Sequence, residues 1–258
     1  MINYFANSSK GEIRPKNDDR VGVFERDNAI LAVLCDGMGG HLAGDIAAST
    51  VVNSLGIEFQ ETFRFIDAIE TKNWITSAIE IVKSDLKKIA EADYEKSQMG
   101  TTLVACLIIP DEKRFFVFNV GDSRAYAYTT NLELIQITKD QNVANSLIEQ
   151  GANLELAYQV PNARHLTSAL GPKISTTVEI YDFDEKSYDK IEKILLTSDG
   201  VHEFMFLNEI EYIIKQPKAP EAIVNQLIAQ AAMNQSNDNM SAIVLDFNRE
   251  KVEVDDAK

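Results

Sequence analysis

One apolar run ends in an aspartate and a glycine, at Ala29-Ile30-Leu31-Ala32-Val33-Leu34-Cys35-Asp36-Gly37. The apolar part has the length and composition of a buried β-strand, so Asp36 is expected in a turn at the end of that strand. Four other acidic positions stand at the end or the start of strand-like runs in the same way. They are Asp122 after 115–120, Asp199 after 194–198, Asp238 before 240–247 and the pair Asp18-Asp19 before 20–24.

These acidic residues are expected to lie close together in the fold. In antiparallel pairing, the C-terminal end of one strand lies beside the N-terminal end of its neighbour, so positions from across the sequence meet at one edge of a sheet. Carboxylates gather in this way mainly where a cation neutralises them. Because every candidate ligand is a carboxylate or a glycine carbonyl, the site favours Mg²⁺, Mn²⁺ or Ca²⁺ over zinc or copper.

The glycines after Asp36 and Asp199 support a cation site. Gly37 and Gly200 are expected to adopt backbone angles that other residues avoid and to bring a carbonyl oxygen close to an ion. Two such ions, roughly 3.5–4 Å apart, activate a water molecule and hold a phosphoryl group. The sequence therefore predicts a multi-metal site, although an isolated Asp-Gly pair is most often only a turn.

The composition limits the classes of function. The formal net charge of -15 in 258 residues argues against a nucleic-acid or anionic-membrane surface, because phosphate groups in such partners bind basic patches. No stretch reaches the ~20 apolar residues that cross a bilayer, and residues 1–10 lack the pattern of a signal peptide. Cys35 and Cys106 stand inside apolar runs and are expected to be buried free thiols. These features predict a cytoplasmic protein with no membrane insertion.

The order of elements predicts an α+β fold. It runs β-αα-βββ-ββ-αα-β, without the alternation of a doubly wound parallel sheet, so antiparallel sheets covered by helix layers are expected. Residues 1–248 are expected to form one domain, followed by a charged, disordered tail at 249–258. The expected strands are 2–6, 20–35, 102–109, 114–120, 124–128, 132–137, 174–181, 191–197 and 240–247. The expected helices are 43–63, 74–91, 142–149, 207–215 and 220–233, and 151–172 is expected to be irregular.

Seven short motifs extend the pattern beyond the acidic residues. They are Gly11-Glu12-Ile13-Arg14-Pro15-Lys16-Asn17-Asp18-Asp19, Leu34-Cys35-Asp36-Gly37-Met38-Gly39-Gly40-His41 with Ala43-Gly44, Met99-Gly100-Thr101-Thr102, Gly121-Asp122-Ser123-Arg124-Ala125-Tyr126, Leu166-Thr167-Ser168-Ala169-Leu170-Gly171, Thr197-Ser198-Asp199-Gly200-Val201 and Asp238-Asn239-Met240-Ser241. In these residues and their order, the chain resembles the bacterial branch of the protein phosphatase 2C family, the metal-dependent (PPM) serine/threonine phosphatases. The motifs cover about residues 8–246. One such motif is a weak signal, but seven in the same order are very specific for this family.

The resemblance implies an αββα four-layer sandwich of two mainly antiparallel β-sheets flanked by helix pairs, with the metals at one end. It places Asp36 as the bridge between two Mn²⁺ or Mg²⁺ ions and Gly37 as the donor of a carbonyl. Asp199 and Asp238 would complete the shell of the first metal. The implied reaction hydrolyses phosphoserine or phosphothreonine by direct attack of a metal-bridging hydroxide, with no covalent enzyme intermediate.

Four further residues receive roles from the same resemblance. Asp18 and Asp19 match the acidic pair that holds waters of the second metal. Asp122 matches, together with Asp199, the ligands of a third and weaker metal. Arg14 falls at the arginine that binds the phosphate, where its guanidinium offers two parallel donors.

The chain departs from the family pattern at several positions. Met38 stands where eukaryotic relatives carry a histidine proposed as the general acid, so His41 becomes the candidate donor, with water as an alternative. The opening motif has Asn17-Asp18-Asp19, whose middle residue is one methylene shorter than the usual glutamate or glutamine. Residues 143–165 match the mobile flap beside the active site, where substrate preference is expected to lie.

Other interpretations stay open at this point. Asp122 also fits an ion pair with Arg124 or a turn cap, and His41 also fits a helix start. The leading function is a phosphoprotein phosphatase, expected to be a monomer that acts on phosphorylated proteins, including a serine/threonine kinase and the substrates of that kinase. The alternatives are a catalytically weak, phosphatase-like regulatory module and a phosphohydrolase with one dedicated partner.

Overall fold

The computed structural model of this chain describes residues 1–39 and 43–247. The candidate general acid, His41, and the predicted tail, 249–258, lie outside the described residues. Within them, no helix combines the length and the apolar content needed to cross a membrane.

Two five-stranded sheets, antiparallel at every pairing, form the centre of the molecule. The first sheet has the order β1 (Asn3–Ser9), β12 (Met240–Asp246), β11 (Ile191–Thr197), β8 (Arg124–Thr129) and β9 (Leu134–Gln136). The second has the order β10 (Glu179–Phe183), β7 (Arg114–Val120), β6 (Leu103–Ile109), β3 (Ala29–Cys35) and β2 (Arg20–Arg26). A short ribbon pairs β4 (Gly37–Met38) with β5 (Gly100–Thr101).

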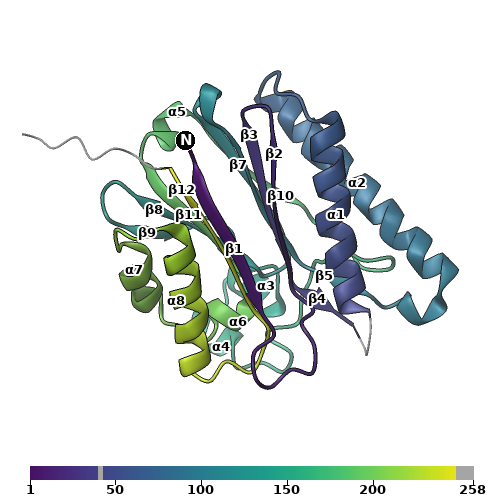
Figure 1. Ribbon diagram of the computed structural model, residues 1–258. Coiled ribbons are helices and arrows are strands. Elements are labelled where there is room, and N and C mark those ends of the chain that lie inside the picture. The colour runs from purple at the N-terminus through teal and green to yellow at the C-terminus, as the bar shows by residue number, and fades with distance from the viewer. Residues whose placement is uncertain (40–42, 248–258) are drawn as a thin grey trace, which may run out of the picture.

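A pair of helices covers the outer face of each sheet (Figure 1). The helices α1 (Gly44–Thr62) and α2 (Ala68–Ala92) lie over the second sheet, and α7 (Leu207–Ile214) and α8 (Pro220–Met233) lie over the first. This arrangement confirms the predicted α+β fold of four layers. The shorter helices are α3 (Val143–Glu149), α4 (Leu154–Ala157), α5 (Glu185–Tyr188), α6 (Asp199–His202), η1 (Tyr94–Lys96) and η2 (Pro110–Glu112).

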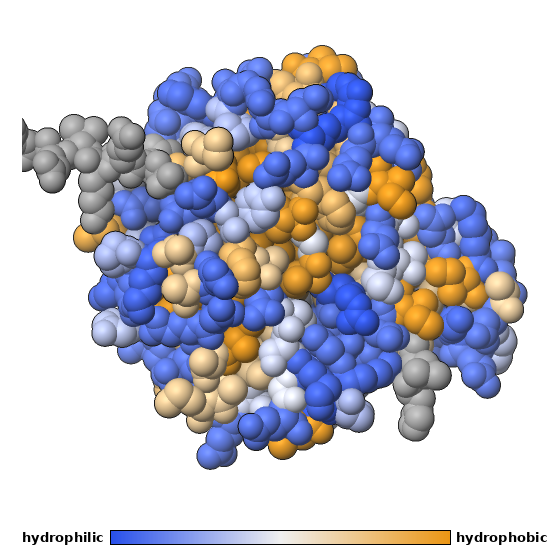
Figure 2. All heavy atoms as spheres, viewed as in Figure 1, coloured by the Kyte–Doolittle hydropathy of each residue, from blue (hydrophilic) through white to orange (hydrophobic). Residues whose placement is uncertain are grey.

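Strand β3 is buried on both faces, which explains its unbroken apolar sequence. Leu31 and Val33 pack in the core beneath α1 and α2. The alternate residues Ala32 and Leu34 pack in a second core between the two sheets. A third core lies between the first sheet and the helices α7 and α8. Figure 2 shows the same side of the molecule as Figure 1, with polar residues over most of the surface and apolar residues near its middle.

The strand registers bring the acidic segments to one end of the sandwich. Cys35 pairs with Arg20, so Asp36 lies beside the Asp18-Asp19 pair. Thr197 pairs with both Ala242 and Arg124, which places Asp199 near the segments that carry Asp238 and Asp122. The site is therefore built from the ends of two stacked sheets rather than from the edge of one sheet.

Several predicted element boundaries were wrong. Strand β1 covers Asn3–Ser9 rather than 2–6, and β9 covers Leu134–Gln136 rather than 132–137. Helix α2 begins at Ala68 rather than at 74, because the Asp67 side chain caps it by accepting a hydrogen bond from the Glu70 amide. Strand β10 covers Glu179–Phe183 rather than 174–181, since the chain before it bonds to Ser168 and Ala169. The segment 151–172, expected to be irregular, contains the one-turn helix α4.

Candidate metal and phosphate site

Asp36 links the end of β3 to the short strand β4 and is fixed through its backbone. Its amide donates to Thr102 Oγ1 at 3.0 Å. Its carbonyl oxygen accepts from the Thr102 amide at 2.9 Å and from Thr101 Oγ1 at 2.8 Å. These three bonds leave the carboxylate as the group that Asp36 presents to its acidic neighbours.

The Asp36 and Asp199 carboxylates interact strongly, because Asp199 raises the pKa of Asp36 beyond the effect of burial, and two ionised carboxylates of this kind need a shared proton or a cation. Burial raises the pKa of Asp36 well above its usual range, and the charges of Asp19, Asp199 and Asp122 raise it further. Burial and the charge of Asp238 raise the pKa of Asp199 as well. We refer to Asp19, Asp36, Asp122, Asp199 and Asp238 together as the carboxylate cluster.

Asp19 is the most deeply buried member of the carboxylate cluster, with 1% of its surface exposed. Its Oδ2 accepts hydrogen bonds from Ser198 Oγ at 2.8 Å and from Ser241 Oγ at 2.6 Å. Burial nevertheless raises the pKa of Asp19 to about 7, with further contributions from Asp199 and Asp238. The fold therefore holds a carboxylate at a place where its charge needs a counter-charge.

Asp122 lies between β7 and β8, at the point where the chain passes from the second sheet to the first. Burial raises the pKa of Asp122 to about 7, and the charges of Asp199 and Asp140 add to this effect. The nearby Arg124 directs its guanidinium to both oxygens of Asp140, at 2.8 and 2.6 Å. Arg124 is thus engaged elsewhere, which leaves Asp122 as part of the carboxylate cluster.

Arg14 is the cationic residue beside the carboxylate cluster. Its Nη2 lies 2.5 Å from Asp238 Oδ2, and its Nε donates to the Asn237 carbonyl at 3.2 Å. Half of the Arg14 side chain is exposed, against a quarter of the Asp238 side chain. The guanidinium therefore stands at the surface of the site, where a phosphate can reach it.

Asn239 holds the loop that carries Arg14. Its Nδ2 donates to the carbonyls of Lys10 at 2.9 Å and of Lys16 at 3.0 Å. Its Oδ1 accepts from the Asp18 amide at 2.7 Å. The carboxylate of Asp18 itself faces Lys16, whose Nζ lies 2.8 Å from Asp18 Oδ1, so the contacts of this carboxylate are outside the carboxylate cluster.

The sequence suggested that Gly37 and Gly200 adopt unusual backbone angles, and this was wrong. The two glycines are needed because a side chain at either position would collide with a neighbouring backbone segment. Neither glycine has a positive φ. A Cβ atom on Gly37 would lie 2.2 Å from the Gly44 carbonyl oxygen, and one on Gly200 would lie 1.9 Å from the Asn239 carbonyl oxygen. Asp199-Gly200 also forms the start of helix α6 rather than a turn.

The carboxylate cluster suits hard divalent cations in its chemistry, because its side-chain donors are all oxygen atoms. Oδ1 of Asp19 and Oδ1 of Asp199 are buried and have no hydrogen-bond partner in the described part of the chain. Such unsatisfied buried oxygens are costly unless an ion or water meets them. Over residues 1–39 and 43–247, no three acidic, histidine or cysteine side chains already form the cage of a single ion, so the ligand assignments stay predictions.

Several residues of the site had no role assigned from the sequence. Ser198 and Ser241 hold Asp19, Thr102 holds Asp36, and Asn239 holds the loop of Arg14. All four stand inside the recognised motifs, directly beside or within three residues of an aspartate or a glycine of the site. Their position in the motifs was the available signal, but their hydrogen-bond partners come from distant parts of the chain.

Comparison with known proteins gives a consistent result over nearly the whole chain. The family model described as Protein phosphatase 2C matches residues 14–244. The serine/threonine phosphatase stp of Listeria welshimeri is 32% identical over 243 residues, which cover 93% of this chain and 94% of the relative. Protein phosphatase PhpP of Streptococcus pneumoniae is 28% identical over 247 residues, which cover 94% and 96%.

Solved structures of bacterial phosphatases have the same fold. The serine/threonine phosphatase Stp1 from Staphylococcus aureus superposes with a TM-score of 0.85 and 30% identity, over 96% of each chain. The catalytic domain of the serine/threonine protein phosphatase PstP, in complex with 2 manganese ions, gives a TM-score of 0.77 with 28% identity, over 95% of this chain and 97% of that one.

Proposed function

Because this chain belongs to the protein phosphatase 2C family and is a serine/threonine protein phosphatase, we propose that it hydrolyses phosphoserine and phosphothreonine with two Mn²⁺ or Mg²⁺ ions at the carboxylate cluster. The similar PstP catalytic domain, which is in complex with 2 manganese ions, supports divalent-metal dependence. We place a third ion at Asp122 and Asp199. The observation that carries the proposal is that Asp19 Oδ1 and Asp199 Oδ1 are buried and have no hydrogen-bond partner among the residues that the structure describes.

Each member of the site has a proposed role. Asp36 would be the ligand shared by both ions, and Gly37 would offer its carbonyl oxygen. Asp199 and Asp238 would complete the set of ligands of the first ion, while Asp18 and Asp19 would hold waters of the second ion. When bound, the ions would supply an activated water and offset the charge of the phosphate.

Arg14 binds and orients the phosphate group in this proposal. A guanidinium presents parallel N–H donors that match phosphate oxygens. Its contacts with Asp238 and with the Asn237 carbonyl hold it at the entrance to the carboxylate cluster. Met38 has no titratable proton, so we keep His41 as the candidate donor to the leaving serine or threonine oxygen. His41→Ala with an unchanged pH profile of kcat would remove it from that role.

The wider setting is also part of the proposal. The phosphorylated proteins on which the enzyme acts include a serine/threonine kinase and the substrates of that kinase, and the enzyme works as a monomer through residues 1–248. Nucleic acids are not partners, in keeping with the net charge of -15. Cys35 and Cys106 are buried free thiols, which supports action in a reducing compartment such as the cytoplasm.

The test is phosphate release from a phosphothreonine peptide, measured with Mn²⁺, with EDTA and with the Asp36→Asn variant. We expect turnover in wild type with Mn²⁺, and its loss with EDTA and in the variant by at least about 10²-fold, the scale on which a charged group that organises catalysis acts. Calorimetric titration of Mn²⁺ into both proteins gives the number of ions. Wild-type protein that binds Mn²⁺ without turnover would favour the regulatory module instead.

A further inference from the structure

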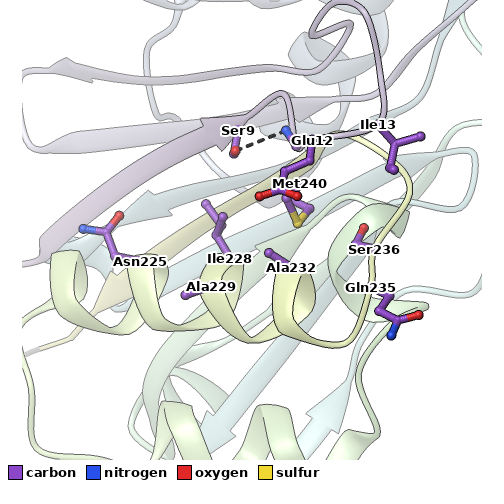
Figure 3. A pocket seen from close by; sticks show the side chains of 11 residues that line it. Ser9, Glu12, Ile13, Asn225, Ile228, Ala229, Ala232, Gln235, Ser236 and Met240 are labelled. Atoms are coloured by element: carbon purple, nitrogen blue, oxygen red, sulfur yellow. Dashed lines mark hydrogen bonds between the residues drawn. The ribbon is translucent and has the colours of Figure 1, made fainter.

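A groove adjoins the carboxylate cluster on the side of helix α8 and has no place in the proposed catalytic machinery. It has a volume of about 620 Å³ and lies between α8 and the segment Ser9–Ile13, which runs from the last residue of β1 into the following loop. Figure 3 shows Ile228, Ala229 and Ala232 on the wall formed by α8, with Met240 at the floor. We call this hollow the α8 groove.

The α8 groove is continuous with the phosphate site along the chain on both of its walls. Ile13, on the loop wall, directly precedes Arg14, and Ser236, on the helix wall, stands two residues before Asp238. Ser236 Oγ also donates to the Gly200 carbonyl at 2.8 Å. Neighbouring Cα atoms are about 3.8 Å apart, so the groove starts within one or two residues of groups that we assign to phosphate and metal binding.

The loop wall is held in place by the site itself. Gly11 has a φ of +72°, and a Cβ atom there would lie 2.8 Å from the Asp238 carbonyl oxygen. This close approach fixes the loop against the segment that carries Asp238. A molecule bound in the α8 groove is therefore held at a defined distance from Arg14.

The lining of the α8 groove combines aliphatic side chains with uncharged polar side chains such as Asn225 and Gln235, and it has a single charged residue. Ile13 is 70% exposed, although it is a large aliphatic residue, and Ala229 and Ala232 are also exposed. Glu12 is the one charged side chain among the lining residues, and Figure 3 shows its carboxylate reaching from the loop toward Met240. The chemistry that fits is an aliphatic side chain next to a lysine or an arginine.

We propose that the α8 groove binds the segment of the phosphoprotein substrate that flanks the phosphorylated residue, and that it selects an aliphatic residue beside a basic one. This inference rests on the proposed function, because it takes Arg14 as the phosphate anchor. An extended peptide advances about 3.3–3.6 Å per residue, so residues two to four positions from the phosphate reach the groove. The acidic charge at Glu12 complements a basic residue there and disfavours an acidic one.

The first test fills the groove with Ala232→Trp. The matched control is Ala222→Trp, which places the same side chain on an exposed position of α8 outside the groove. Two substrates are compared with Mn²⁺ present: a phosphothreonine peptide with leucine and arginine within four residues of the phosphate, and p-nitrophenyl phosphate, which is too small to reach the groove. We expect Ala232→Trp to lower kcat/KM for the peptide about tenfold or more through KM, with turnover of p-nitrophenyl phosphate within about twofold of wild type.

The second test reverses the charge with Glu12→Lys. We expect kcat/KM to fall about threefold for the basic peptide and to rise about threefold for the same peptide with glutamate in place of arginine, the scale of an exposed ion pair. Equal losses on the peptide and p-nitrophenyl phosphate, or no change on either, would overturn the inference. So would a change in sedimentation of Ala232→Trp, which would assign the groove to a second copy of the chain. Wild-type protein that hydrolysed neither substrate would defeat the proposed function, and this inference with it.

Discussion

At the scale of single residues, the site depends on how closely two backbone segments approach. The Gly200 Cα stands so near the Asn239 carbonyl that a methyl group would lie 1.9 Å from its oxygen. Gly200 follows Asp199, and Asn239 follows Asp238, so the missing side chain allows two predicted ligands to lie side by side. The sequence indicated that these aspartates meet. It could not indicate why glycine is needed, because the reason lies in contacts between distant segments.

We predict that Gly200→Ala separates these two segments. Overpacking of this kind typically costs about 1–3 kcal/mol of unfolding free energy, and here the obstacle is backbone, which yields less than a side chain. The matched control is Gly151→Ala, where φ is +96° but nothing lies within 4 Å of the added methyl group. Urea unfolding should show a loss in both variants, and calorimetric Mn²⁺ affinity should fall only in Gly200→Ala. Unchanged Mn²⁺ affinity in Gly200→Ala would contradict this account.

The ion pair between Arg124 and Asp140 is partly buried and bidentate, with distances of 2.8 and 2.6 Å. We predict that Asp140→Asn costs about 3 kcal/mol of unfolding free energy, because it leaves a buried guanidinium without its counter-charge. Glu149→Gln is the control, since the pair of Lys139 and Glu149 is mostly exposed and should matter by less than about 1 kcal/mol. Urea unfolding measures both variants. Equal unfolding midpoints would show that the pair of Arg124 and Asp140 stabilises the fold no more than the exposed pair does.

At the scale of elements, the sequence was most informative where the apolar pattern was strong. The bounds of β7, β11 and α8 agree with those predicted, because each has an apolar run or stripe that is buried along its whole length. The prediction missed the segment Ala68–Asn73 at the start of α2, where Ile69 is exposed and adds nothing to the helical stripe. It also shifted β10, whose residues are only partly buried. Elements at the surface carry a weaker sequence signal than elements in the core.

The start of α2 gives a prediction at this scale. Asp67 accepts a hydrogen bond from the Glu70 amide at 2.8 Å, so Asp67→Ala should lower the free energy of unfolding by about 1 kcal/mol. Asp67→Asn keeps an oxygen acceptor at the same place and should cost much less. Urea unfolding measures both, and kcat for a phosphopeptide should stay at the wild-type level in each, since α2 covers the outer face of the second sheet. A loss of kcat in Asp67→Ala would link α2 to the site.

At the scale of the whole molecule, the stacking of two sheets gathers negative charge at one end. Asp19 and Asp36 come from the segments around β2 and β3, whereas Asp199 and Asp238 come from those around β11 and β12. The sequence predicted that the acidic residues meet through antiparallel pairing within a sheet. It could not predict from pairing alone that Asp19 reaches across to the hydroxyls of Ser198 and Ser241, because that contact joins the two sheets.

This concentration of charge makes stability depend on pH when no cation is bound. Burial raises the pKa of Asp19 and of Asp122 from 3.8 to about 7, so the folded protein binds protons more tightly than the unfolded chain between those values. Stability from these groups is therefore fully present below pH 4 and is lost as the pH rises toward 7. For one carboxylate the limit is roughly 4 kcal/mol, and repulsion shared within the carboxylate cluster prevents simple addition.

We therefore predict that EDTA-treated protein loses unfolding free energy between pH 5 and pH 7.5, and that saturating Mn²⁺ removes or reverses this slope. A cation favours the ionised carboxylates, so protons compete with it and its stabilising effect grows with pH. Asp19→Asn cannot ionise at this position, and its slope in EDTA should be smaller than that of wild type. Urea unfolding at a series of pH values measures all three. Two results would contradict this account: an unfolding free energy of the wild type in EDTA that increases with pH, or an Asp19→Asn variant with the same pH slope as wild type. Either would mean that the fold does not disfavour the ionised form of Asp19.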